Sequence, residues 1–529
     1  MTVRRLMGSE TEYGVIAPAS PQANPTVLSA AVVNTYTRIV QRTLQKKTHS
    51  DWEYGSESPL QDSRGKLVDA DQAHPSQLTH RFAVLTSEEI AAEALQEAGL
   101  YAERLDWDSV SMNSVLPNGA RFYVDHAHPE YASPESMYPQ EALLWDLAGD
   151  YICAQTVAEI AEHANEQGLP VINLYKNNTD SKGQSYGAHE NYLLSRETNF
   201  DDVIAGLLPF FATRHIMIGA GRVGIGRNGQ YAGFQISQRA DFFERTVGLE
   251  TTLRRPMVNT RDEPHADNSK YRRLHVISGD ANMSQYSNLL KFGTAALVLE
   301  LIEKGACPRI LLKDPVEAMH TVSHDLTLSA RLPLTNGQSM TALEIQESYL
   351  KAAWELEAQA DQQTHEVLSL WQQTLQGLRT DLFSLADRLD WVAKYQLLGH
   401  YLNQGLDWKD PKLAAIDLQY ADIRPQKGLY FKLVERGRMQ TIFSQQEIQA
   451  ASWKPPTDTR AFLRGMMVRQ WPEELVSVNW DTIVTRDLAT GHLCRFLMPE
   501  PDQFTRDQVK KFLSYAKASD VLAELKESS

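Results

Sequence analysis

RFYVDHAHPE, residues 121–130, combines the alternation of a β-strand with an unusual density of ionisable side chains. By the strand period of two, Arg121, Tyr123 and Asp125 fall on one face, and two histidines and Glu130 follow in the turn. Such groups prefer water or a metal ion, because burying an unpaired charge costs free energy. The segment therefore predicts a sheet that presents a functional face.

Composition and charge narrow the class of protein. The chain has 529 residues, 42% of them hydrophobic and 22% charged, which is typical of a large globular protein. Its formal net charge of −15 argues against a protein whose main task is to hold nucleic acid. The cysteines, Cys153, Cys307 and Cys494, form no C-x-x-C pair. Neither a zinc site nor a disulfide framework is indicated, and a reducing cytoplasm is expected.

No targeting or membrane segment is predicted. The first residues, MTVRRLMGSETEYGV, lack the apolar stretch of a signal peptide. The most apolar segment, residues 293–302, is too short to span a bilayer and contains Glu300. We therefore expect a soluble, cytoplasmic protein with neither nucleic acid nor a membrane as its partner.

Two domains are predicted from shifts in the pattern. Residues 1–425 mix strands with amphipathic helices and are expected to form one large catalytic domain. Within it, residues 46–80 are polar and rich in turn formers, and a tract of that kind is usually functional or disordered. After the turn IRPQKG the pattern changes, so residues 426–529 are expected to form a small C-terminal domain. Its first segment, GLYFKLVERGRMQTIF (428–443), has the alternation of a hairpin.

GAGRVG, residues 219–224, matches the dinucleotide fingerprint G-x-G-x-x-G in letters alone. That fingerprint requires a helix immediately after the glycines, with its N-terminus on the pyrophosphate. Here three more glycines and a strand-like segment follow, so we expect a glycine-rich loop and no NAD site. The chain also lacks the P-loop, H-E-x-x-H and G-x-S-x-G motifs, which disfavours P-loop enzymes, metalloproteases and serine hydrolases.

Acids and histidines on several predicted strands form the remaining candidate site. Glu10 lies on the first strand, His189 and Asn191 share one face of AHENY, and His275 lies within RRLHVIS. Carboxylate and imidazole ligands in oxygen-rich surroundings suit Mg²⁺ or Mn²⁺ near nucleotide phosphates better than structural zinc. The arginines that would neutralise phosphates or hold a carboxylate are Arg121, Arg227, Arg239 and Arg273.

Each of these residues also has a structural interpretation. A single histidine or glutamate on a strand is more often solvated or hydrogen-bonded for structural reasons than functional. The set is harder to explain in that way, because its acids interrupt strands that are otherwise apolar. On physical grounds alone, the residues indicate a metal and phosphate site on a sheet.

Longer segments resemble a known family. They are MGSETEYG (7–14), NGARFYVDHAHPEYASPE (118–135), YKNNTDSKGQSYGAHENYL (175–193), FQISQRADFFE (234–244) and NTRDEPHADNSKYRRLHVISGDANMSQYSNLLK (259–291). Together they resemble the Pup ligase/depupylase family, and the resemblance extends from the N-terminus through VNWD near residue 480. It implies an α+β fold, in which a large glutamine-synthetase-like domain forms a curved, mostly antiparallel sheet cradle packed by helices, with a small C-terminal domain.

The family has two branches. Ligases attach the prokaryotic ubiquitin-like protein Pup to lysines, and hydrolases deamidate Pup and remove it. VDHAHPEYASPE has two residues between its aspartate and HPEY, one fewer than the ligase pattern LDVGSHPEYAT, and WEYGSESPLQDSRG (52–65) resembles an insertion that ligases lack. Both features favour the Pup deamidase/depupylase branch.

The resemblance also implies roles for individual residues. Asp125 aligns with the catalytic base or nucleophile. Ser133 stands where ligases often have threonine, a departure that keeps a hydroxyl. The positions implied to contact magnesium are Glu10, Tyr123, Glu130, His189 and His275. Those implied to contact the nucleotide are Arg121, Ser133, Arg239 and Trp480.

The chemistry that follows is hydrolysis of the isopeptide bond between the γ-carbonyl of Pup's C-terminal glutamate and a lysine amine, or of the side-chain amide when that residue is glutamine. ATP, or ADP with phosphate, and Mg²⁺ are implied as bound cofactors. Pup, pupylated proteins and components of the proteasome pathway are implied as partners. Three alternatives stay open: a Pup–protein ligase that consumes ATP, a non-catalytic adaptor for Pup or the proteasomal ATPase, and a ligase for a small substrate.

Overall fold

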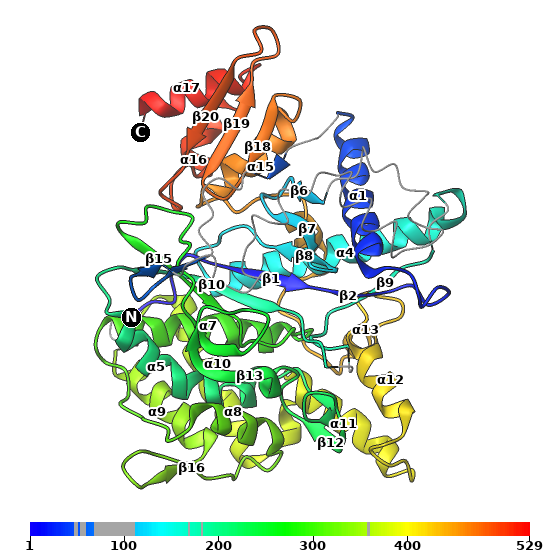
Figure 1. Cartoon of the computed structure of the whole chain (residues 1–529), viewed down its shortest axis with the longest axis vertical. Helices are drawn as coiled ribbons and strands as arrows, with labels where there is room; N and C mark the ends of the chain where they lie inside the picture. Colours follow the sequence, from blue (N-terminus) through cyan, green and yellow to red (C-terminus); the bar gives the residue numbers. More distant parts are fainter. Residues whose placement is uncertain are drawn as a thin grey trace.

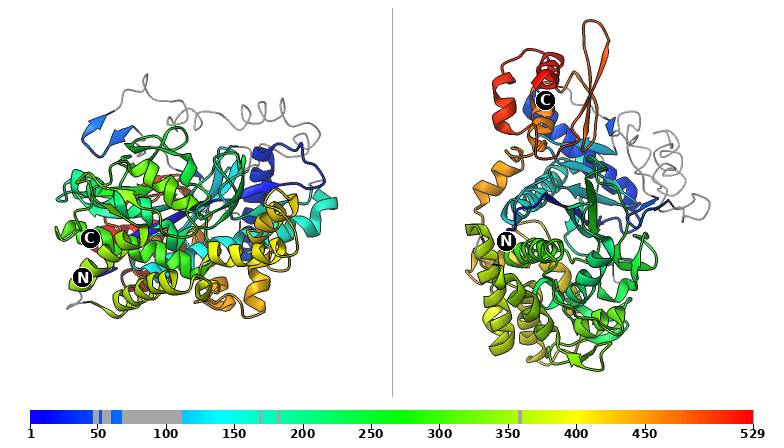
Figure 2. Two further views of the ribbon diagram at one scale, coloured as in Figure 1. Left: turned by 90° about the horizontal axis from the view of Figure 1, so that it is seen from below. Right: turned by 90° about the vertical axis from the view of Figure 1, so that its left-hand side faces the viewer.

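The computed structural model describes residues 1–46, 51–52, 60–67, 112–167, 170–180, 183–356 and 360–528. Most of the tract predicted at residues 46–80 therefore lies outside the described residues. In Figure 1 and in the right-hand view of Figure 2, a central sheet lies between a helical half at one end and a C-terminal unit, coloured orange to red, at the other.

The central sheet has six antiparallel strands in the order β15-β10-β1-β8-β7-β6. The predicted strand at residues 121–125 is confirmed: β7 buries Phe122 and leaves Arg121, Tyr123 and Asp125 partly exposed, although Val124 is partly exposed as well. The strands are β1 (Met7–Glu12), β6 (Asn113–Val115), β7 (Arg121–Asp125), β8 (His128–Ala132), β10 (Ala188–Ser195) and β15 (Tyr271–Val276).

Helix α4 (Pro139–Gln167) covers the rear face of the sheet. Thr11 of β1 donates a hydrogen bond from its hydroxyl to Asp146 of α4 at 3.1 Å. Because successive side chains of a strand point to opposite faces, Glu10 and Glu12 point to the open face. The contact with α4 therefore determines which side of the sheet carries the acids.

A buried ion-pair triad joins α4 to the residue that follows β9 (Asn173–Tyr175) and, through Tyr13, to the end of β1. Lys176 Nζ lies 2.7 Å from Asp146 Oδ2 and 2.9 Å from Asp150 Oδ2, and Tyr13 donates to Asp150 at 2.7 Å. Burial opposes the charge of Lys176, but the two carboxylates outweigh it and raise the pKa of its amine. The Asp146 carboxylate also accepts a hydrogen bond from Asn288 of helix α7 (Gln285–Glu303) at 2.7 Å. The helical half is therefore linked to α4 at the same residue.

The helical half contains the largest hydrophobic cluster, in which Trp371 and Trp391 are fully buried. Its principal helices are α5 (Phe200–Thr213), α7 (Gln285–Glu303), α8 (Pro315–His324), α9 (Ala342–Glu355), α10 (Gln362–Thr380) and α11 (Asp390–Leu402).

The C-terminal unit has its own cluster, which runs from Phe462 to Leu525 and includes Trp52 and Val115 from the first part of the chain. Its sheet has the order β20-β19-β18-β3, and β3 pairs in parallel with β18. The elements are α15 (Ala461–Gln470), β18 (Leu475–Val478), β19 (Thr482–Arg486), β20 (Leu493–Leu497), α16 (Arg506–Val509), α17 (Ala518–Ser528) and β3 (Asp51–Trp52). The domain boundary expected near residue 425 stays a prediction.

The predicted hairpin at residues 428–443 is wrong. The segment begins with helix α13 (Leu429–Glu435), and α14 (Gln445–Ala451) follows. Leu429 and Leu433 are four residues apart, so the same letters fit a helix as well as a strand. Packing decides between them, because Tyr430 is buried against Tyr420 of α12 (Pro411–Tyr420).

The glycine-rich segment at residues 219–224 is confirmed as a loop that leads into a strand. β11 (Arg222–Ile225) pairs with β12 (Tyr231–Gln235) in an antiparallel hairpin. Gly221 and Gly224 have φ angles of +69° and +89°, a conformation that glycine adopts readily. The helix that a dinucleotide site requires is replaced by β11.

The remaining elements are short or lie at the edges. They are β2 (Gly14–Ile16), α1 (Pro25–Leu44), β4 (Gln61–Asp62), β5 (Lys66–Leu67), β9 (Asn173–Tyr175), α6 (His215–Ile218), η5 (Ala240–Phe242), β13 (Phe243–Gly248), β14 (Arg255–Asn259), β16 (Leu332–Pro333), β17 (Ser339–Met340), η7 (Leu382–Leu385) and η8 (Lys510–Phe512). In the described part of the chain, no helix combines the length and apolar character that a bilayer crossing requires.

We predict that Glu135→Gln destabilises the protein at neutral pH. Glu135 lies 2.9 Å from Arg460 Nε, and it also pairs with Arg464. Burial opposes ionisation, but the two arginines outweigh it and lower the pKa of Glu135 to about 2. Breaking such a buried pair costs about 3 kcal/mol or more, which thermal unfolding at pH 7 would detect as a lower Tm.

The pH dependence of this effect follows from the direction of the shift. Because the pKa is lower in the folded protein than in the unfolded chain, the stabilisation is complete above the unfolded value, about 4.3. The difference between wild type and Glu135→Gln should therefore narrow as the pH falls from about 5 toward 2. Glu347→Gln, which breaks an exposed pair with Arg379, is the control and should cost less than about 1 kcal/mol. Equal effects of the two variants would contradict the prediction.

Candidate active site

The register of β1 brings acids of neighbouring strands together. β1 lies between β8 and β10, with Glu10 opposite His189 and Glu12 opposite Glu130. On the far side of β8, Tyr123 of β7 lies opposite Glu130. The open face of the sheet therefore holds acids from two neighbouring strands side by side.

One group of potential metal ligands consists of Glu10, His189 and His275, whose ligand atoms all lie within 4.8 Å of one another. Nδ1 of His189 lies 3.4 Å from Glu10 Oε2, and the two imidazole rings meet edge to face at 4.9 Å. Asn191 donates to Glu10 Oε1 at 3.0 Å, and Arg273 Nη1 lies 3.4 Å from Oε1. The structure brings together all three of these predicted ligands.

Electrostatics keep this group ready to bind a cation. Burial opposes ionisation of Glu10, but a hydrogen bond from His189 and the neighbouring His275 and Arg273 side chains hold the pKa of its carboxyl well below the ordinary value. Burial and neighbouring positive charge lower the pKa of His275 well below its ordinary value. His275 is thus neutral at pH 7, the form that binds metals.

The second group consists of Glu12, Asp125 and Glu130, again with ligand oxygens within 4.8 Å of one another. Burial, followed by the charges of Asp125, Glu12 and Glu10, raises the pKa of Glu130 well above its ordinary value. Burial also raises the pKa of the neighbouring Tyr123 hydroxyl. The described residues supply no positive charge adequate to neutralise Glu130, whereas a divalent cation would.

The two donor sets fit a hard divalent cation. Three carboxylates form an all-oxygen set, which suits Mg²⁺ or Mn²⁺, and the first group adds imidazole nitrogens that Mn²⁺ also accepts. A third group, Glu159, Glu162 and His163 on α4, has similar spacing. It lies near the C-terminal end of α4 and not on a strand of the central sheet.

Glu12 is a potential ligand that the sequence-based assignment omitted. Burial opposes its ionisation, but hydrogen bonding from His128 and the charges of His128 and His189 lower its pKa to about 2. Its Oε1 accepts from the backbone N–H of Gly187 at 2.8 Å. A side chain at position 187 would collide with His189 and Glu12. The spacing of two between Glu10 and Glu12 was the signal in the sequence that could have identified Glu12.

The predicted nucleotide contacts occupy different places. Ser133 and Trp480 line the same narrow pocket, together with the first half of β1 and Arg460. Arg121 lies beside it, with its guanidinium 4.0 Å from the Trp52 ring and 3.8 Å from the Tyr123 ring. Trp52 in turn meets Trp480 at 5.3 Å. Arg239 does not line this pocket.

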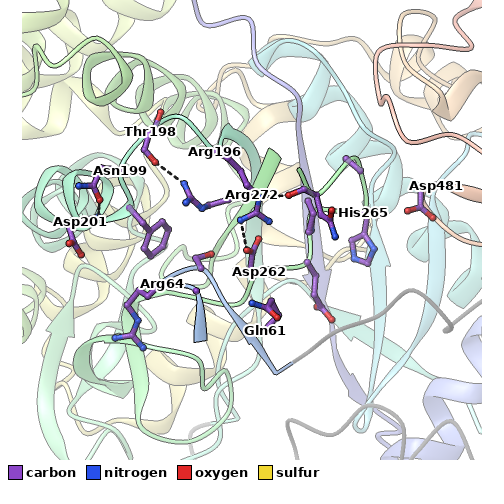
Figure 3. A pocket seen from close by; sticks show the side chains of 17 residues that line it. Gln61, Arg64, Arg196, Thr198, Asn199, Asp201, Asp262, His265, Arg272 and Asp481 are labelled. Carbon is purple, nitrogen blue, oxygen red and sulfur yellow. Dashed lines mark hydrogen bonds and ion pairs between the residues drawn. The ribbon is translucent and has the colours of Figure 1, made fainter. Parts of the chain in front are cut away.

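A cavity of about 820 Å³ adjoins the narrow pocket and shares Pro264 and His265 with it (Figure 3). Its walls carry Arg196, which pairs with Asp262 at 2.8 Å, and Arg272, which donates to the carbonyl of Thr198 at 2.7 Å. Another wall is formed by Gln61, Ser63, Arg64 and Gly65, from the segment that resembles the family's insertion. The β4–β5 hairpin, which contains these residues, is held against the wall of the cavity because Ser63 N–H donates to the Thr260 carbonyl at 2.7 Å.

Comparison with protein families gives a match that spans most of the chain. The model of the Pup-ligase protein family matches residues 5–484. The chain belongs to the Pup-ligase protein family.

Full-length relatives in the Pup-ligase family include a depupylase from Acidothermus cellulolyticus, 44% identical over 99% of both chains. A Pup deamidase/depupylase from Mycolicibacterium smegmatis is 41% identical, also over 99% of both chains. A Pup–protein ligase from Kineococcus radiotolerans is 39% identical but matches 78% of this chain and 92% of its own. The match to the ligase is thus less extensive than the matches to the hydrolases.

Solved structures of the family confirm the predicted α+β, glutamine-synthetase-like fold. The complex between Pup and its ligase PafA superposes with a TM-score of 0.75, 30% identity and coverage of 99% of this chain and 94% of that one. PafA in complex with ADP gives a TM-score of 0.70, 33% identity and coverage of 85% and 99%. The roles of individual site residues stay predictions.

We predict that Mg²⁺ raises the Tm of the metal-free protein by relieving the repulsion among Glu12, Asp125 and Glu130. A ligand that binds only the folded state stabilises it, by about 2.7 kcal/mol at 100 times its Kd. Binding should also release protons into a weakly buffered solution, since Glu130 must ionise to bind the cation. Titration calorimetry in two buffers and thermal unfolding measure both effects.

Variants locate the cation. Glu12→Gln removes one ligand of the second group and should abolish most of the Mg²⁺-dependent rise in Tm. Glu162→Gln changes an exposed acid of the α4 group and should leave the rise unchanged. An undiminished rise in Glu12→Gln would place the Mg²⁺ site elsewhere.

Proposed function

We propose that the chain is an ATP- and Mg²⁺-dependent hydrolase of pupylated proteins, a depupylase that also deamidates a C-terminal glutamine of Pup. The observation that carries this proposal is the position of Asp125. Its side chain is 39% exposed at the end of β7, while its partners Glu12 and Glu130 are buried. One carboxylate is therefore accessible to a substrate at the edge of a cluster that can hold a cation.

Asp125 is held in place by its surroundings. His126 Nδ1 lies 3.0 Å from Asp125 Oδ2, and His126 adopts a positive φ of 52°, which few residues other than glycine do. As general base, Asp125 would take a proton from water while the water oxygen attacks the γ-carbonyl carbon. The C–N bond then breaks, and the proton passes to the leaving amine.

Direct attack by Asp125 is the second route. The carboxylate oxygen would bond to the carbonyl carbon and expel the amine, which takes up a proton, and water would then open the mixed anhydride. Both routes need negative charge on the attacked oxygen to be stabilised. A divalent cation, when bound by the carboxylates, supplies that stabilisation.

The nucleotide is proposed to bind where Ser133 and Trp480 line the narrow pocket and extend toward the adjoining cavity. Arg121 would act from its place between Trp52 and Tyr123. ATP, or ADP with phosphate, would stay bound as a cofactor and not be consumed. The ADP complex of the related PafA supports nucleotide binding in this fold.

Other candidate functions receive less support. A ligase of the same fold is disfavoured, because the hydrolases match the chain over 99% of its length and the ligase over 78%. A pure adaptor for Pup has no need of buried carboxylates whose repulsion requires a cation. A cytoplasmic location, with Pup and pupylated proteins as partners, accompanies the proposal, and the three cysteines are free thiols.

We predict that Asp125→Asn abolishes hydrolysis while nucleotide still binds. The amide can neither accept the proton nor attack, so turnover of a Pup conjugate should fall by about 10²- to 10⁴-fold or more. Gel analysis of released substrate measures turnover, and fluorescence titration measures nucleotide affinity. Asp507→Asn, at an exposed carboxylate of α16, is the control. Full activity in Asp125→Asn would exclude Asp125 from the mechanism.

A single assay separates the hydrolase from the ligase. Purified protein is mixed with Mg²⁺ and a Pup–protein conjugate, with ATP, with a non-hydrolysable analogue or without nucleotide. Release of intact substrate and free Pup with the analogue is the expected result, because the nucleotide acts as a cofactor. Attachment of free Pup to lysines, with ATP converted to ADP, would overturn the proposal.

A further inference from the structure

Two buried guanidinium groups near the carboxylate clusters have no carboxylate partner. Arg239 is 1% exposed and Arg255 is 8% exposed. Among the described residues, neither forms an ion pair, although other buried arginines do: Arg214 pairs with Glu190, and Arg460 with Glu135. Burial of an unpaired charge is costly, so these two arginines need an explanation.

Their hydrogen bonds leave donors unused. Arg239 donates from Nε to the Ser185 hydroxyl at 3.2 Å and from Nη1 to the Ile277 carbonyl at 2.6 Å. Arg255 donates from Nε to the Thr251 carbonyl at 3.0 Å and from Nη2 to the Ser185 carbonyl at 2.7 Å. Every acceptor is neutral. Nη2 of Arg239 and Nη1 of Arg255 donate to no group in the part of the chain that the structure describes.

The charge balance at this point favours an anion. Burial, together with the charge of Arg255, lowers the pKa of Arg239 to about 9, and burial also lowers the pKa of Arg255. An anion with two oxygens would accept from the unused nitrogens and offset the cost of burying both charges.

The arginine pair is connected to the second carboxylate group through three consecutive residues. Ser185 accepts from both arginines, Tyr186 stacks on His128 at 4.4 Å, and Gly187 N–H donates to Glu12. His128 Nδ1 lies 3.4 Å from Glu12 Oε2. The arginines therefore lie next to the carboxylates on which the proposed hydrolysis depends.

This end of the site is opposite to the nucleotide pocket. That pocket is lined by the residues of β10 from Asn191 to Leu193 and by the first half of β1. Ser185 precedes Asn191 by six positions, which in extended chain is up to about 20 Å. Glu12 lies between the two ends, on the last position of β1.

We propose that Arg255, with Arg239 beside it, binds the free α-carboxylate of the C-terminal residue of Pup. This inference rests on the proposed function. The bond to be cleaved joins the side-chain carbonyl of that residue to an amine, so its α-carboxylate stays free a few bonds away. An enzyme that brings the side-chain carbonyl to Asp125 must place this carboxylate near the same cluster, and the arginine pair is a built receptor for it.

The first test changes the substrate and leaves the enzyme intact. Wild-type enzyme is given a Pup conjugate in which the α-carboxylate of the C-terminal residue is replaced by an α-carboxamide. A charge-assisted pair of hydrogen bonds should be lost, and kcat/KM should fall by about 10- to 100-fold. An undiminished kcat/KM would overturn the inference. Failure to cleave the unmodified conjugate would instead sink the proposed function.

The second test completes a double-mutant cycle. Arg255→Gln should lower kcat/KM for the normal conjugate by a similar factor, and amidation of the substrate should then cost less than about 3-fold, because the partner is already gone. Arg255→Lys should recover part of the rate. Arg245→Gln is the control, since Arg245 lies on β13, which pairs with the strand of Arg255, but is exposed and paired with Glu250 at 3.3 Å.

Nucleotide affinity distinguishes the other source of an anion, a nucleotide phosphate. Titration with ADP and with ATP should give the same Kd for wild type and Arg255→Gln. If Arg255→Gln weakens nucleotide binding 10-fold or more and the effect of substrate amidation is unchanged, the pair binds phosphate and the inference is wrong. Thermal unfolding of each variant confirms that loss of rate does not reflect loss of the fold.

Discussion

The repulsion among carboxylates on one face of the central sheet is the constraint on which the rest of the structure depends. β1 places Glu10 and Glu12 two residues apart, and β8 places Glu130 directly opposite Glu12. The negative charge of each acid is stabilised by different groups: that of Glu10 by His189, His275 and Arg273, and that of Glu12 by His128 and a backbone N–H. Glu130 is left without adequate compensation. The arrangement makes sense as the binding site of a cation.

A face that carries mutually repelling charges must be held from behind. Helix α4 does this through Asp146 and Asp150, which share Lys176 in a buried triad. Next to it, Glu190 of β10 points to the rear face and pairs with the fully buried Arg214 at 2.7 Å. On the rear face, Asp146, Asp150 and Glu190 are therefore each paired with a lysine or arginine of the protein. On the front face, carboxylates and arginines without such partners are left to bind ligands of opposite charge.

Much of this site could be predicted from the sequence because its signals are local. The period of two in RFYVD gave the correct face for Arg121, Tyr123 and Asp125, and the missing helix after GAGRVG excluded a dinucleotide site. What could not be predicted depends on contacts between distant segments. Arg255 donates a hydrogen bond to the carbonyl of Ser185, which lies seventy residues earlier in the chain. No local sequence pattern predicts a contact of this kind. The hairpin predicted at 428–443 failed because packing against Tyr420 selects a helix from an ambiguous apolar run.

The parallel pairing of β3 with β18 has a consequence for how the protein is made. Trp52 emerges from the ribosome about 430 residues before its partner Val478. At about 5 to 20 residues per second, synthesis of the intervening chain takes roughly 20 to 85 s. The contact between Trp52 and Trp480 beside Arg121, an aromatic wall of the site, cannot form during that time. An incomplete nascent chain therefore lacks this part of the site. Premature termination anywhere before β18 would therefore yield a product that cannot assemble this wall, even where the central sheet has already folded.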